Sequence, residues 1–189
     1  MSEEWKSAES KRSKYKDRVA VSEIKMLEEE DRFRSSIGDE GHPAQEIAYL
    51  KAKELWAIDN VRLAEAIVEL TGIDRAISLE TKKSDGILVT QVNPELADAK
   101  KGCAEAKIQH AQTIEKLLEV RIRNAQDEKE RERLDRMLEN ASMQLKVALN
   151  ELASSTANQI ESETLSEGCR LIVLICPCFL LSFFLSDCD

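Results

Sequence analysis

The fold is decided by residues 44–80, AQEIAYLKAKELWAIDNVRLAEAIVELTGIDRAISLE, where apolar side chains recur at helical spacing. One stripe consists of Ile47, Leu50, Ala57, Val61, Ala64 and Val68, and a second, adjoining stripe of Leu55, Ile58, Leu63, Ile67, Leu70, Ile73 and Ile77. Together the stripes form an apolar arc that is wider than one partner helix needs. We therefore expect a central helix here, packed by neighbouring helices on two sides.

The residues before this stretch predict another helix over residues 3–35. Apolar residues are sparse near its start and denser from Val19 to Phe33, which is typical of a helix with a narrow apolar stripe. The stretch SSIGDEGHP, residues 35–43, contains two glycines and a proline and predicts a turn. Pro43 suits the first turn of the central helix, because its missing N–H costs nothing there.

A third helix is predicted over residues 94–163. Asn93, Pro94 and Glu95 fit an N-cap, a first helical residue and an acidic first turn. A heptad pattern follows, but residues 124–133, NAQDEKERER, are polar in every register. We expect this polar stretch to be an exposed, protruding section of a bundle that folds back on itself.

These patterns predict an all-α fold: an elongated antiparallel helical bundle or coiled coil with a hydrophobic C-terminal tail. Its expected parts are an N-terminal helix within residues 1–35, a bundle core over 44–163, a linker over 164–170 and the tail over 171–186. The composition agrees, because 33% charged residues, 4% aromatic residues and only 6 Gly and 3 Pro suit long helices.

The sequence offers few residues for catalysis or metal binding. His42 and His110 are the two histidines, and no CxxC, HExxH or phosphate-binding glycine motif occurs. The net charge of −9 argues against general nucleic-acid binding. Four of the five cysteines lie in residues 169–188, which does not suit a disulfide framework across the body. We expect no catalytic residue, metal or cofactor, and a body that faces a reducing compartment.

The C-terminal tail differs from the rest of the chain, because residues 171–186 carry no charge. As a helix this stretch would span about 24 Å, against about 30 Å of membrane hydrocarbon. Three interpretations stay open: a membrane anchor, an apolar strap packed on the bundle, or a non-native terminus. The anchor is favoured, since Arg170 precedes the stretch and acidic residues follow it, which fits a cytoplasmic body.

An anchor this short would gain from acylation. Cys176 and Cys178 lie inside the apolar tail and are the candidate acylation sites. On this interpretation the cytoplasmic body is attached to an intracellular membrane by its C-terminal tail.

For function, the pattern favours a non-enzymatic scaffold, tether or assembly subunit that binds a protein partner, or another copy of itself, through helix faces. The candidate partner-facing seam consists of Leu138, Leu145 and Leu152, which occupy equivalent heptad positions. Packing inside the chain is the alternative role for these leucines.

A function of another class rests on the basic run KRSKYKDR, residues 11–18. In that alternative the protein is a membrane-surface module that binds anionic lipid. The lipid-binding residues would be Lys11, Arg12, Lys14 and Lys16. Runs of this kind are also found on solvated helix faces without any ligand.

Overall fold

The computed structural model describes the backbone of residues 2–38, 41–84 and 94–183, and the side chains of residues 2–38, 41–80 and 94–157. The described residues form four α-helices: α1 (Glu3–Ser35), α2 (His42–Ser84), α3 (Pro94–Asn124) and α4 (Glu128–Phe183). The all-α fold class is therefore confirmed. The bounds of α1 are those predicted, and α2 begins two residues before the predicted start, with Pro43 in its first turn.

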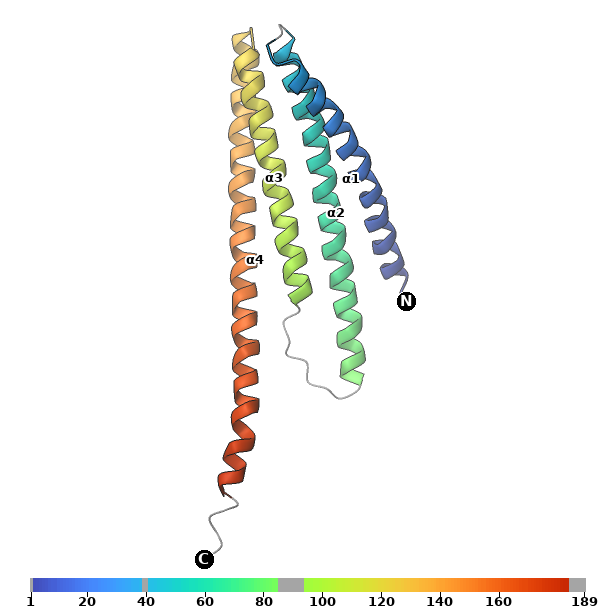
Figure 1. Cartoon of the computed structure of the whole chain (residues 1–189), viewed down its shortest axis with the longest axis vertical. Coiled ribbons are helices and arrows are strands. Elements are labelled where there is room, and N and C mark those ends of the chain that lie inside the picture. Colours follow the sequence, from blue (N-terminus) through green and yellow to red (C-terminus); the bar gives the residue numbers. More distant parts are fainter. Residues whose placement is uncertain (1, 39–40, 85–93, 184–189) are drawn as a thin grey trace, which may run out of the picture.

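The helices pack as an open row in chain order (Figure 1). Among the described residues α1 packs on α2, α2 on α3 and α3 on α4, each pair antiparallel, and no other pair of helices is in contact. A closed four-helix bundle would also bring the first helix against the last. The prediction of a central helix over residues 44–80 is confirmed, because α2 has a neighbour on each side.

Local capping explains where α1 begins and ends. The Ser2 hydroxyl accepts a hydrogen bond from the backbone N–H of Trp5 at 3.2 Å, as an N-cap side chain does. At the other end, the Ser36 N–H donates to the carbonyl of Arg32. Gly38 follows with a φ of 101°, a left-handed conformation that glycine adopts without strain. The chain can therefore reverse direction between α1 and α2.

The prediction of one helix over residues 94–163 is wrong, because the chain reverses at residues 125–127. Asp127 caps the new helix: its carboxylate accepts a hydrogen bond from the N–H of Lys129 at 3.2 Å. Arg131 donates to the carbonyl of Ala125 at 3.2 Å and so satisfies a group left free after α3. The polar stretch 124–133 is thus the turn between two helices, and not a protruding section of one.

Two apolar clusters hold α2, α3 and α4 together. Between α2 and α3, Leu50 packs with Leu117 and Val120. Between α3 and α4, Leu118 packs with Leu134 and Ala141, and the half-buried side chains around them are Ile114, Ile122, Ala125 and Leu138. Apolar burial along these contacts is the main stabilising force of the row.

The helix α4 is the longest of the described helices, with 56 residues against 31 in α3. At 1.5 Å per residue α4 is about 84 Å long and α3 about 46 Å. The C-terminal part of α4 therefore extends past the end of α3, as Figure 1 shows. The backbone of α4 continues as a helix through residues 164–170, a stretch that was predicted to be a linker.

Candidate functional site

A groove on the described surface crosses α2, α3 and α4. Two adjoining cavities of about 550 and 670 Å³ form it and share the side chains of Lys107, Val147 and Glu151. The smaller cavity lies between α3 and α4 and is also lined by Met143, while the larger one reaches Val68 of α2. We refer to the two cavities together as the α2–α3–α4 groove.

Exposed apolar side chains line this groove. Val147 is 57% exposed and Met143 is 52% exposed, although both lie in the part of α4 that packs on α3. Ala111 and Ala148, which also line the groove, are buried, so their small side chains leave the space open. These four residues form an apolar strip along the smaller cavity, and polar side chains such as Asn140 and Gln144 lie at its edges.

A single ion pair crosses the described part of the groove between α3 and α4. The Nζ atom of Lys107 lies 2.9 Å from Oε2 of Glu151. This hydrogen bond raises the pKa of Lys107 above its usual value of 10.5, against the opposing effect of burial. Cys103, beside them, is buried, and burial raises the pKa of its thiol, although the nearby Lys107 acts in the other direction.

Among the titratable side chains of the groove, His110 has the ordinary pKa that lies closest to neutral pH. Burial lowers the pKa of its imidazole below 6.5, while the Glu54 carboxylate on α2 acts in the opposite direction. Its Nε2 atom is buried and has no hydrogen-bond partner among the described atoms. The folded chain therefore favours the neutral form of His110.

The structure places the predicted leucine seam along the contact between α3 and α4. Leu138 packs against the cluster of Leu118, Leu134 and Ala141, so this side chain contributes to packing inside the chain. Leu145 and Leu152 are half-buried. Their role in a partner interface stays a prediction.

The basic run divides into residues with and without ion pairs. Lys11 lies 2.8 Å from Glu69 of α2, and Arg12 lies 2.6 Å from Glu9 on its own helix. Lys14 and Lys16 are exposed and form no ion pair with the described residues. The four predicted lipid-binding residues thus do not form one free basic patch.

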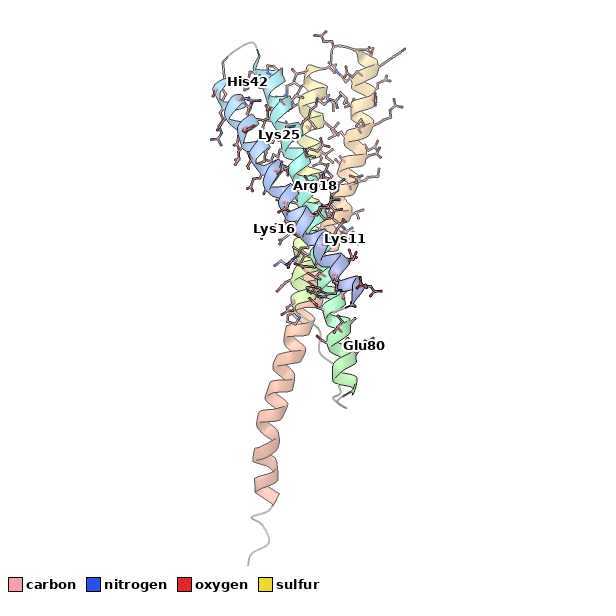
Figure 2. The ribbon with its side chains drawn as sticks, turned by 90° about the vertical axis from the view of Figure 1, so that its right-hand side faces the viewer. Lys11, Lys16, Arg18, Lys25, His42 and Glu80 are labelled. Atoms are coloured by element: carbon pink, nitrogen blue, oxygen red, sulfur yellow. The ribbon has the colours of Figure 1, made fainter. Side chains whose placement is uncertain are left out.

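Arg18, at the end of the same run, contacts the carboxylate of Asp59 on α2 at 3.1 Å. Asp59 is only 3% exposed and is also within 3.5 Å of Arg62. Figure 2 shows Lys11, Lys16 and Arg18 along α1, in front of α2. Arg18 of the basic run therefore joins α1 to α2 through an ion pair, a role that the sequence of the run did not indicate.

The hydrophobic tail, with Cys176 and Cys178, lies outside the residues whose side chains are described. Across the part of the chain that is described, no helix has the length and apolar content needed to cross a membrane. In that same part, no group of three or more His, Cys, Asp or Glu side chains is placed to hold a metal ion.

The groove residues Met143 and Val147 were not predicted as functional. A signal for them exists in the sequence, because both are apolar and fall outside the seam positions of the heptad that contains Leu138 and Leu145. An apolar residue away from the seam of an exposed helix points to a second contact surface.

Comparison with known proteins gives no relative. No protein-family model, no curated protein and no solved structure matches the chain.

Proposed function

We propose that the protein is a non-enzymatic helical scaffold or tether that binds a protein partner through its helix faces. The observation that carries the proposal is the open row: the α2–α3–α4 groove has exposed Met143 and Val147 and no fifth element over it among the described residues. Scattered apolar residues are normal on a protein surface, but apolar residues gathered along a groove are typical of a binding site.

The partner segment that fits this groove best is an amphipathic helix. The groove runs along the axes of α3 and α4, and an apolar helix face with side chains at every third or fourth position would contact Met143 and Val147 in succession. Lys107 and Glu151 lie beside these residues and would fix the register of a helix that carries polar residues at its edges.

The proposed tether also uses the length of α4. Its backbone carries residues 171–183 beyond the end of α3, and the tail over 171–186 is the proposed membrane attachment. Acylation of Cys176 and Cys178 remains part of this proposal. In this arrangement the row would be held at a distance from the membrane with its groove accessible from the side.

Site-specific photo-crosslinking tests the scaffold proposal. A photoreactive residue at Met143 of the full chain, expressed in its own cells, should form a discrete adduct with a protein. Val147→Glu should abolish that adduct, because it places a charge in the apolar strip. The matched control, Lys146→Glu, changes an exposed residue outside the strip and should leave the adduct intact.

The outcomes separate the two classes of function. Equal adducts with Val147→Glu and Lys146→Glu, or no protein adduct at all, would contradict a binding groove. The alternative function, a membrane-surface module, predicts lipid adducts from Lys14 and Lys16 on α1. The ion pairs of Lys11 and Arg12 weigh against it, because binding to lipid would have to compete with them.

A further inference from the structure

The helix α1 is an edge of the row and has two different faces. One face packs on α2 through Ala8, Ser22 and Met26, which are buried. The opposite face carries Val21, Ile24 and Leu27, which are 69%, 60% and 50% exposed. Among the described helices α1 contacts only α2, and Figure 2, which looks at α1 from outside the row, shows no other helix in front of it.

Charges of opposite sign lie on either side of this exposed apolar patch. Residues 11–18 contain five basic residues and one acidic residue, and residues 28–31 are all acidic. Glu29 and Glu30 pair with arginines on the same helix. In these two segments, five exposed charges remain without an ion pair among the described residues: Lys14, Lys16, Asp17, Glu28 and Asp31.

Along α1, a positively charged segment is followed by an apolar one and then by a negatively charged one. In an antiparallel pair of α1 helices, the positive segment of each helix therefore lies beside the negative segment of the other. An antiparallel pair centred between Val21 and Ile24 places Val21 of each helix beside Ile24 of the other. The same register brings Lys14 opposite Asp31 and Lys16 opposite Glu29, which already pairs with Arg32. A parallel pair would instead bring like charges together, which is unfavourable. Asp17 is the exception, because it falls near Glu28 in the antiparallel register.

We propose that a second copy of this chain binds the outer face of α1, so that two rows join edge to edge through antiparallel α1 helices. The contact is isologous, as expected for a two-fold dimer. The inference deepens the scaffold function, on which it rests, by naming the partner of one surface. It leaves the α2–α3–α4 groove of each copy free, because the contact involves the opposite end of the row.

Charge reversal on the full chain in mild detergent tests this pairing. The variant Lys14→Glu should fail to pair with itself, and Asp31→Lys should fail as well, because each brings like charges together where Lys14 faces Asp31. An equimolar mixture of the two variants should form a heterodimer. Energy transfer between labelled chains and sedimentation of the mixture measure the pairing directly.

A substitution in the exposed apolar patch of α1 provides a second test of the dimer. Ile24→Glu replaces an exposed side chain, so the chain should still fold, and it should weaken the dimer by at least about tenfold by placing a charge at the centre of the contact. The matched control is Ile77→Glu, at another exposed apolar residue outside α1. This control should leave pairing unchanged.

Two results would overturn the proposal: a wild-type chain that is monomeric at every concentration, or a failure of the mixed variants to restore pairing. Binding of anionic vesicles that is lost in Lys14→Glu and gained in Asp31→Lys, without any dimer, would assign the face to lipid instead. If pairing fails while the Met143 adduct persists, the scaffold function stands and only the self-association is wrong.

Discussion

The two outer contacts of the row, α1 with α2 and α3 with α4, are built in different ways. Between α1 and α2, polar contacts add to the burial of Ala8 and Met26: the Trp5 indole donates to Asp74 at 2.6 Å, and Lys11 and Arg18 pair with carboxylates of α2. Between α3 and α4, Leu118, Leu134 and Ala141 form a buried apolar cluster.

The two contacts differ in how strongly they depend on the positions of particular atoms. Apolar burial is roughly proportional to the area removed from water and has no direction. Hydrogen bonds and ion pairs depend on the positions of particular atoms, but most of them contribute little net stability at a surface. We infer that the α3–α4 contact supplies more of the stability, and that the α1–α2 contact sets register and orientation.

The largest effect should come from the α3–α4 contact. Leu134→Ala removes one of the most completely buried side chains and should lower the free energy of unfolding by about 2–5 kcal/mol. Urea denaturation followed by circular dichroism measures it. Leu149→Ala, the same substitution at an exposed position of α4, is the control and should change stability by less than about 0.5 kcal/mol. Equal losses in the two variants would contradict the assigned packing.

In the α1–α2 contact the sensitive point is the buried carboxylate of Asp59. Arg18→Ala leaves this carboxylate with only Arg62, at 3.5 Å, and should cost about 1–3 kcal/mol. Lys11→Ala, which removes an exposed ion pair of the same contact, should cost at most about 1 kcal/mol. If Lys11→Ala were the more damaging change, the ordering by burial would be wrong.

The turn between α3 and α4 should respond to the loss of its cap. Asp127→Ala removes the side chain that accepts the Lys129 N–H and should cost about 1 kcal/mol. Asp135→Ala, at an exposed position within α4, is the control and should be neutral within about 0.5 kcal/mol. Equal stability of the two variants would show that the cap contributes nothing.

The groove side of α3 should show a pH dependence through His110. Because burial lowers its pKa in the folded chain, the unfolded chain takes up the proton first as the pH falls below 6.5. This contribution to stability is present above pH 6.5 and is lost as the pH falls toward the lower folded pKa. Stability of wild type relative to His110→Gln should therefore fall across that range. A difference that stays constant with pH would contradict the burial of this imidazole.

Much of the fold could be predicted from local patterns. The extent of α1, the turn before Pro43 and the wide apolar arc of α2 all follow from spacing within one segment. The apolar stripe predicted for α1 is wrong at Val21, Ile24 and Leu27, which are exposed. The turn at residues 125–127 was missed, because a stretch that is polar in every register has no periodicity that could show where a helix reverses. The capping signal, Asp127 followed by Glu128 and Glu130, was available in the sequence.

The surfaces could be predicted less well than the helices. The α2–α3–α4 groove depends on how α2 and α4 are placed around α3, which no segment specifies alone. The ion pairs of Lys11 and Arg18 also join residues distant in sequence, so the basic run could not be divided without the structure. The outer face of α1 was also missed, because the face that packs on α2 contains Ser22 and small Ala8, while the larger Val21 and Ile24 are exposed.

The open arrangement of the four helices can be checked by measuring the distance between α1 and α4. Fluorescent or spin labels on a genetically encoded residue at Lys25, paired in turn with exposed positions of α4 from Arg136 to Lys146, give a series of distances in the full chain. Helices in contact have axes about 8–10 Å apart, and in the open row two helices lie between α1 and α4. We therefore predict a shortest separation of roughly 25 Å. A shortest separation of about 10 Å would mean that α1 packs against α4 in a closed bundle. That result would contradict the open row, the accessible groove and the free face of α1 together.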